Sequence, residues 1–145
     1  FQVIIHDISE ALWALHTSHI LHLDLKPSNI LVRSLHPLNL ILTDFGISTL
    51  LDSDISRQIT DTKGTPMYWA PEQLGNFVGE DADFWALGVI ALEIVMGKHP
   101  LEGLNHNLIL STLSSRGIPV PDTTQVGVAA SRLLVFHICL PAASP

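Results

Sequence analysis

The chain is poor in cysteine, which is typical of small secreted proteins, and in Lys and Arg, which are typical of proteins that bind nucleic acid. It has a single cysteine, Cys139, in 145 residues, and one cysteine excludes the internal disulfide framework typical of small secreted domains. Lys and Arg number 7 against 14 Asp and Glu, for a formal net charge of −7. Surfaces that bind nucleic acid carry an excess of Lys and Arg. The sequence therefore predicts an intracellular, cytoplasmic protein that does not bind nucleic acid.

Long hydrophobic runs are also missing. The densest apolar stretch, residues 84–96, has 11 apolar residues in 13, which is shorter than the ~20 residues that cross a bilayer. It predicts a buried helix and no membrane span, because a helix that is apolar on every face must be surrounded by protein. Charged residues make up only 14% of the chain, against roughly 25% in typical domains. That shortage favours a core-rich piece of a larger protein.

Apolar periodicity predicts the first elements of the chain. Spacings of three and four residues predict a helix over residues 1–16, carried by Ile5, Ile8, Leu12 and Leu15. Two short apolar runs, 30–32 and 40–43, predict strands joined by a loop at 34–39. Residues 47–66 are polar without a sustained period, and a loop of that length in a compact domain is usually functional.

The apolar run at 84–96 carries signals for the ends of a helix. Asp81 and Asp83 suit the positive N-terminal end of the helix dipole, and Gly97 and Pro100 mark its end. Two weaker patterns beyond it predict short helices, at residues 104–113 and 132–140. The expected fold is mainly α with small β-hairpins.

Three polar clusters lie at the ends of apolar elements, at residues 22–29 (HLDLKPSN), 44–46 (DFG) and 64–72 (GTPMYWAPE). Asp24 and Asn29 lie five residues apart in a segment that leads into a strand, so their carboxylate and amide oxygens can converge. Asp44 ends the next strand, and Gly46 permits a sharp turn after it. Two oxygen ligands on adjacent strand ends suit Mg²⁺, which keeps waters and takes further ligands from substrate phosphates.

These motifs, in this order and joined by a polar loop, resemble the C-terminal lobe of a protein kinase of the Ser/Thr type. The resemblance covers residues 1–103 and makes residues 104–145 a divergent or truncated end of the same lobe. It implies the C-terminal lobe of the α+β protein kinase fold. It also implies transfer of the ATP γ-phosphoryl group, with Mg²⁺, to Ser or Thr hydroxyls of protein substrates.

The same resemblance implies roles for individual residues. Asp24 resembles the catalytic Asp that accepts the proton of the substrate hydroxyl, and Lys26 resembles the Lys that contacts the transferred phosphoryl group. Asn29 and Asp44 resemble the two metal ligands, and together with Lys26 they would bind the cofactor. Thr65 resembles the residue that ties the loop after the activation segment to the catalytic Asp.

Around these motifs the chain keeps one family feature and departs from two others. Asp83 resembles the Asp of the buried central helix that holds the catalytic-loop backbone. Asp24, however, follows Leu23, where the family usually has an Arg that pairs with a phosphate on the activation loop. An apolar side chain cannot hold a phosphate, so control through that ion pair is not expected. The family's late Arg, the buried partner of the residue equivalent to Glu72, has only Arg132 as a candidate.

The family's N-terminal lobe, with its glycine-rich loop, strand Lys and helix Glu, has no counterpart in the sequence. We therefore expect the 145 residues to be inactive alone, to expose apolar surface on the strands at 30–32 and 40–43, and to need that lobe as a partner. The alternative is a non-catalytic, pseudokinase-like scaffold or a degraded kinase gene product. The presence of Asp24, Lys26, Asn29 and Asp44 argues against that alternative.

Overall fold

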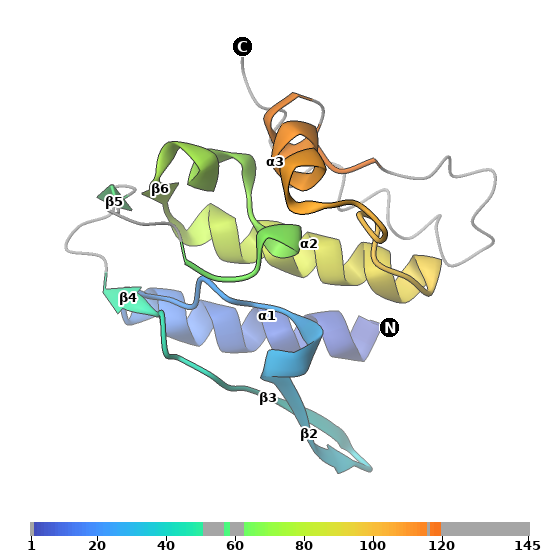
Figure 1. Ribbon diagram of the computed structural model, residues 1–145. Helices are drawn as coiled ribbons and strands as arrows, with labels where there is room; N and C mark the ends of the chain where they lie inside the picture. The colour runs from blue at the N-terminus through green and yellow to red at the C-terminus, as the bar shows by residue number, and fades with distance from the viewer. Residues whose placement is uncertain (1, 51–56, 59–62, 116, 120–145) are drawn as a thin grey trace.

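The computed structural model describes residues 2–50, 57–58, 63–115 and 117–119. Two long helices, α1 (Gln2–Thr17) and α2 (Glu80–Met96), lie antiparallel against each other, and the shorter α3 (His106–Ser115) lies beyond α2 (Figure 1). The three sheets of the described residues are each a single antiparallel pair of strands. This arrangement confirms the predicted mainly α fold with small β-hairpins.

The main core lies between α1, α2 and the strand β3 (Leu38–Leu42). As predicted from its spacing, α1 buries Ile5, Ile8 and Leu12, while Leu15 is partly buried at the edge of the same cluster. Burial of each such side chain stabilises the fold by roughly 1.5–3 kcal/mol. Leu25, from the polar motif at residues 22–29, is 1% exposed and belongs to this cluster. The core therefore fixes the position of that motif.

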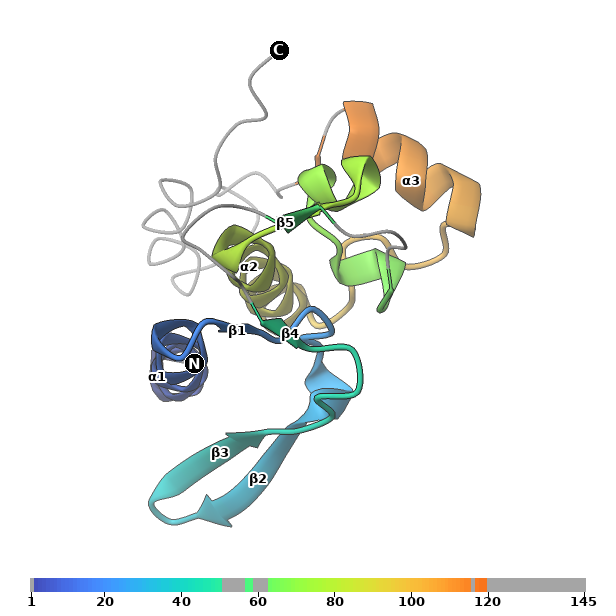
Figure 2. The same ribbon diagram turned by 90° about the vertical axis from the view of Figure 1, so that its left-hand side faces the viewer.

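The strands β2 (Ile30–Leu35) and β3 are longer than predicted. Their register pairs Leu35 with Leu38 and contains an irregularity between Val32 and Ser34. The predicted loop at 34–39 is therefore wrong, because backbone pairing continues to a turn at residues 36–37. Pro37 lies in that turn, where its missing N–H removes no ladder hydrogen bond. The hairpin extends below the two long helices in Figure 2, and its strand β3 packs against α1.

The predicted exposure of apolar side chains on these strands is confirmed for Leu31, Val32 and Ile41 and wrong for Ile30 and Leu42. Leu31 and Ile41 form one cross-strand pair and are 53% and 40% exposed. Ile30 and Leu42 form the neighbouring pair, which packs against the α1 side of the core. The two pairs differ because successive side chains of a strand point to opposite faces.

Helix α2 begins earlier than the apolar run, with an acidic first turn that includes Asp81 and Asp83, and it ends at Gly97 in the left-handed region (φ 69°), as predicted. Its burial is less complete than expected. Within the described residues Phe84 is 41% exposed and Ile94 is 42% exposed. The prediction of a helix surrounded by protein on every face is therefore confirmed for residues 86–92, which are all buried, and wrong at Phe84 and Ile94, nearer the two ends of the helix.

The predicted polar loop contains two short strands that its sequence does not reveal. β4 (Thr49–Leu50) pairs with β1 (Ile20–Leu21), and β5 (Arg57–Gln58) pairs with β6 (Phe77–Val78). Three 3₁₀ turns complete the described elements, at Pro27–Asn29, Pro66–Tyr68 and Pro71–Gly75.

The weaker helix predicted at 104–113 is confirmed as α3, displaced by two residues. Asn105 explains the later start, because its Oδ1 accepts a hydrogen bond from the N–H of Leu108 at 3.0 Å, as an N-cap does. The helix predicted at 132–140 lies outside the described residues. Among those described, no helix is long and apolar enough to span a membrane.

Candidate active site

Asp83 of helix α2 anchors the loop that carries Asp24. Its side chain is 1% exposed, and its two carboxylate oxygens accept hydrogen bonds from the backbone N–H groups of His22, at 2.9 Å, and Leu23, at 2.8 Å. A buried carboxylate needs such donors to offset its desolvation. The backbone on the N-terminal side of Asp24 is thus held by the central helix, in the manner that the resemblance implies.

The ring of His22 joins this loop to the strand end that precedes Asp44. His22 is fully buried; its Nδ1 accepts a hydrogen bond from the N–H of Asp24 at 3.3 Å, and its Nε2 lies 3.1 Å from the carbonyl oxygen of Thr43. These two contacts fit a neutral ring protonated on Nε2. The sequence analysis assigned no role to this ring.

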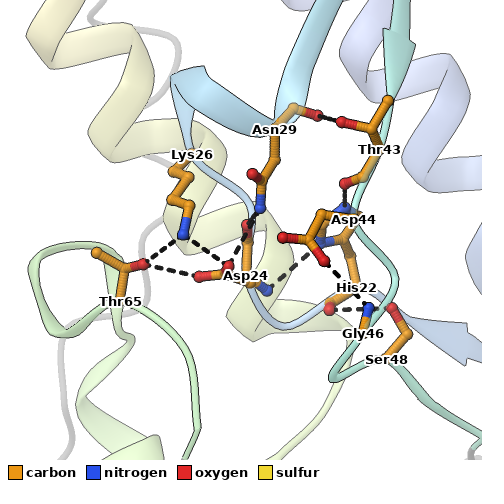
Figure 3. Close-up of polar contacts among 9 residues, drawn as sticks. All are labelled: His22, Asp24, Lys26, Asn29, Thr43, Asp44, Gly46, Ser48 and Thr65. Carbon is orange, nitrogen blue, oxygen red and sulfur yellow. Dashed lines mark hydrogen bonds and ion pairs between the residues drawn. The ribbon is translucent and has the colours of Figure 1, made fainter.

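Asp24 lies at the centre of the polar contacts in Figure 3. Its Oδ2 accepts hydrogen bonds from Lys26 Nζ at 2.7 Å and from Asn29 Nδ2 at 3.1 Å, while its Oδ1 accepts one from the Thr65 hydroxyl at 2.8 Å. Lys26 Nζ also donates to Thr65 Oγ1 at 2.9 Å. Four of the residues predicted to be catalytic therefore lie in one hydrogen-bonded group.

Asn29 and Asp44 are brought together by the backbone between their strands. The carbonyl oxygen of Asn29 accepts hydrogen bonds from the backbone N–H of Thr43, at 2.9 Å, and from the Thr43 hydroxyl, at 3.2 Å. Thr43 directly precedes Asp44, which is exposed and has a left-handed backbone (φ 63°). The turn places the Asp44 carboxylate beside the loop that holds Asn29 (Figure 3).

The electrostatic surroundings keep Asp24 ionised. Burial by itself would raise the pKa of this carboxyl, whose side chain is only 11% exposed. The hydrogen bonds from Lys26, Thr65 and Asn29 and the positive charge of Lys26 outweigh burial, so the pKa lies below its ordinary value. Asp24 is therefore a carboxylate at neutral pH and can only accept hydrogen bonds.

Thr65 reaches Asp24 because the glycine before it allows a close approach. Gly64 has a φ of 105°, and a Cβ at that position would lie 2.8 Å from the carbonyl oxygen of Leu23. Only glycine tolerates both the backbone conformation and the contact. The segment ending in Thr65 can thus lie directly against residues 22–29.

Comparison with known proteins shows which family has this group of polar residues. Residues 1–126 match the family described as the protein kinase domain. The chain belongs to the protein kinase family. The predicted membership is therefore confirmed, whereas the boundary predicted at residue 103 stays a prediction.

Three relatives show what share of the length of a protein kinase this chain covers. It is 37% identical over 145 residues to the serine/threonine-protein kinase Pkn1 of Myxococcus xanthus, covering 96% of this chain and 20% of that protein. It is 34% identical over 135 residues to the serine/threonine-protein kinase ULK3 of Xenopus laevis, covering 92% and 28%. The third, the striated muscle preferentially expressed protein kinase of Danio rerio, is 42% identical over 96 residues, covering 66% and 3%. The kinase chain thus spans 28% or less of each of these relatives.

A buried polar residue of α1, His16, was assigned no functional role from the sequence. It is 5% exposed, and its Nε2 lies 2.9 Å from Oδ2 of Asp83. It also contacts the ring of Phe84 edge-on. The available signal was its place four residues after Leu12, on the apolar face of α1, because a polar group on a buried face needs a partner.

The histidines at 16, 19 and 22, whose spacing of three superficially suggests a metal cluster, have separate surroundings. His16 contacts Asp83 and His22 contacts Thr43, whereas His19 is exposed. In the part of the chain that the structure describes, no group of three or more His, Cys, Asp or Glu side chains is arranged to hold a metal ion.

The loop after Thr65 is fastened to α2 by a second polar contact. The Tyr68 hydroxyl donates a hydrogen bond to Oε2 of Glu93 at 2.7 Å. Burial, the hydrogen bond and the charge of Glu93 all raise the pKa of Tyr68, so the phenol stays protonated at any physiological pH. The ring of His99 packs edge-on against Tyr68, with the ring centroids 4.9 Å apart.

His99 makes the stability of this region depend on pH. It is 7% exposed, and its Nδ1 accepts a hydrogen bond from the N–H of Leu101 at 3.0 Å. Burial lowers the pKa of His99 and outweighs the opposing effects of Glu93, Met67 and Glu102. The unfolded chain therefore takes up this proton first as the pH falls.

We expect the stabilising contribution of His99 to the free energy of unfolding to be complete above pH ~6.5. It should be lost as the pH falls from there toward the pKa of His99 in the folded protein, with a slope of at most ~1.4 kcal/mol per pH unit. The His99→Asn variant keeps an acceptor for Leu101 but has no titrating group. Urea unfolding of both full-length proteins between pH 5 and 8 is the measurement. A slope that is unchanged in the variant would contradict the assignment to His99.

Glu72, which the family pairs with a late Arg, does not have the burial that we expected. Its side chain is exposed in the structure. Partial desolvation nevertheless raises the pKa of Glu72, and the charge of Asp81 adds to that rise. Arg132, the candidate partner, lies outside the described residues.

Proposed function

We propose that the full-length protein is a serine/threonine protein kinase, which transfers the γ-phosphoryl group of ATP to Ser or Thr hydroxyls of protein substrates. The observation that carries this proposal is the ionised Asp24 carboxylate, held between Lys26 and Thr65. The printed names of two of the relatives above, both serine/threonine kinases, support the choice of acceptor.

The hydrogen bonds around Asp24 leave room for a substrate hydroxyl. A carboxylate has about four acceptor positions, and three of them are used here, two on Oδ2 and one on Oδ1. We assign the remaining position, on Oδ1, to the substrate hydroxyl. As the hydroxyl oxygen bonds to the γ-phosphorus and the bond to the bridging oxygen of the leaving diphosphate breaks, the hydroxyl proton passes to Asp24.

Lys26 supports the same step from the other side. Its ammonium group has three donors, of which one binds Asp24 and one binds Thr65. The third is available for an oxygen of the transferred phosphoryl group. Positive charge at that point favours the charge distribution of the transition state over that of the ground state.

Asn29 and Asp44 suit Mg²⁺ by the chemistry of their oxygens. The Nδ2 group of Asn29 donates to the carbonyl and carboxylate oxygens of Asp24, at 2.8 and 3.1 Å, so its Oδ1 is available as a ligand. Asp44 is exposed, and among the described residues its Oδ1 accepts a single, long hydrogen bond, from the N–H of Gly46 at 3.3 Å. Bound there, the ion would neutralise charge on the ATP phosphates.

The second wall of the nucleotide site would come from the longer protein. Leu31, Val32 and Ile41 expose apolar side chains at the strands beside Asp44, and the chain covers only a small part of its relatives. We therefore infer that a preceding N-terminal lobe covers this surface together with the nucleotide. We expect residues 1–145 alone to be inactive, and the cytoplasmic location stays a prediction.

We test the function with the full-length protein, ATP labelled on its γ-phosphate and a mixture of protein substrates. We expect label on Ser or Thr, no transfer after chelation of Mg²⁺, and for Asp44→Asn a rise of roughly tenfold or more in the Mg²⁺ concentration that gives half-maximal activity. Asp81→Asn, the same change on an exposed carboxylate of α2, is the matched control and retains the wild-type Mg²⁺ dependence. Label on Tyr alone, or an unchanged requirement in Asp44→Asn, would contradict the proposal.

A further inference from the structure

The Leu23 side chain lies in an apolar cluster that joins separate parts of the chain. Leu21 and Val78 are both 0% exposed and form the centre of this cluster, and the half-buried Leu23 packs against them. We call these three residues the Leu23 cluster. It is separate from the main core between α1 and α2.

Each of the two partners of Leu23 pairs with a strand from the loop between Asp44 and Thr65, which we call the activation segment. Leu21, on β1, is paired with Thr49 on β4. Val78, on β6, is paired with Arg57 on β5. The Leu23 cluster therefore lies where two separate strands of the activation segment are attached to the lobe.

The backbone of Leu23 contacts two further parts of the lobe, Asp83 of α2 and Gly64. Its N–H donates to Oδ1 of Asp83 at 2.8 Å, and its carbonyl oxygen lies so close to Gly64 that a Cβ there would be 2.8 Å away. The next residue along the chain is Asp24. A displacement of Leu23 would thus move the carboxylate relative to Thr65, whose hydroxyl donates to it at 2.8 Å.

We propose that Leu23 is a positioning residue that couples the activation segment to Asp24 by apolar packing, so that the segment adopts its working arrangement without a bound phosphate. This inference rests on the proposed function and adds its mode of regulation. The hydrophobic contacts of Leu23 and the short β1–β4 and β5–β6 pairings hold the activation segment in place, as an ion pair between a cation and a phosphate would. Because they are uncharged and buried, they are present as soon as the chain folds.

The test uses the full-length protein after phosphatase treatment and compares Leu23→Ala with Leu23→Met, which conserves volume. Leu15→Ala is the matched control, because Leu15 is also half-buried but packs on the main core. Amide hydrogen exchange is followed at residues 49–50 and 77–78, and kcat and the KM values are measured alongside it.

For Leu23→Ala we expect exchange at both strand pairs to rise roughly tenfold, because truncation leaves a cavity and frees local opening. We also expect kcat to fall with little change in the KM for ATP, and Leu23→Met to recover most of both effects. Leu15→Ala lowers overall stability without this local signature. Phosphatase treatment leaves the wild-type activity within about twofold, because the contacts involved carry no charge.

Unchanged exchange at both strand pairs in Leu23→Ala would overturn the proposal, and so would a wild-type activity that disappears with phosphatase. If Leu23→Ala does not fold, Val78→Ala removes the contact from the other side and carries the same expectation. A wild-type protein that transfers no phosphate would contradict the proposed function only. The exchange measurements would still decide whether Leu23 couples the segment to the catalytic loop.

Discussion

Replacement of Asp24 by asparagine is expected to lower kcat for phosphoryl transfer by about 10²–10⁴-fold in the full-length kinase, the usual contribution of a positioned general base. Asparagine has nearly the same volume, but an amide cannot take the hydroxyl proton. Its carbonyl oxygen can still accept from Lys26 and Asn29, but its Nδ2 group then occupies the position of Oδ1, where it donates instead of accepting a proton. The Kd for ATP should change little, because Asp24 is not one of the proposed metal ligands.

The kinetic comparison for this variant needs only two measurements, steady-state transfer to a protein substrate and nucleotide binding without turnover. Asp81→Asn serves as the control, since Asp81 is exposed and contributes nothing to the polar group around Asp24. Turnover retained in Asp24→Asn would contradict the assignment of Asp24 as the general base. A wild-type protein that binds partners but transfers nothing would instead favour the non-catalytic scaffold.

Replacement of Asp83 by alanine is expected to reduce the free energy of unfolding by about 3–5 kcal/mol, because it leaves buried polar groups without a partner. The groups affected are the backbone N–H groups of His22 and Leu23 and the buried ring of His16. Such a loss is a large part of the ~5–15 kcal/mol that stabilises a typical domain.

Denaturant unfolding of the full-length protein measures this loss. Asp81→Ala removes a carboxylate from the same turn of α2, and as an exposed residue it should cost no more than ~0.5 kcal/mol. A double-mutant cycle with His16→Ala separates the shared part, since the His16 substitution should cost less once Asp83 is absent. A loss below ~1 kcal/mol for Asp83→Ala would show that water or another acceptor replaces the carboxylate.

Much of the site was predictable because its residues are close together in the chain. Asp24, Lys26 and Asn29 lie within six residues, and the motif around them indicated the chemistry before any fold was known. Thr65 and Asp44 were predicted by resemblance, and the structure places Thr65 against Asp24 and Asp44 on the neighbouring strand end. The roles of these residues in catalysis remain proposals that the variants above test.

The partners of the histidines could not be predicted in the same way. His16 and Asp83 are 67 residues apart in the chain, and His22 and Thr43 are 21 apart. A spacing rule relates neighbours on one helix or strand, whereas these contacts depend on how α1 packs against α2 and where a strand ends. The sequence showed only that a polar side chain lay on a buried face.

The sequence by itself determined the long helices, the polar motifs and the family, because helical periodicity and motif spacing are properties of adjacent residues. The tertiary structure alone decided the two-residue pairings of β4 and β5, since a strand that short has no period of its own to detect. It also decided that Leu23, in the place of the family's Arg, packs against Leu21 and Val78. Its contact with Val78 joins residues far apart in the chain, and it forms because folding makes the burial of their apolar surfaces favourable.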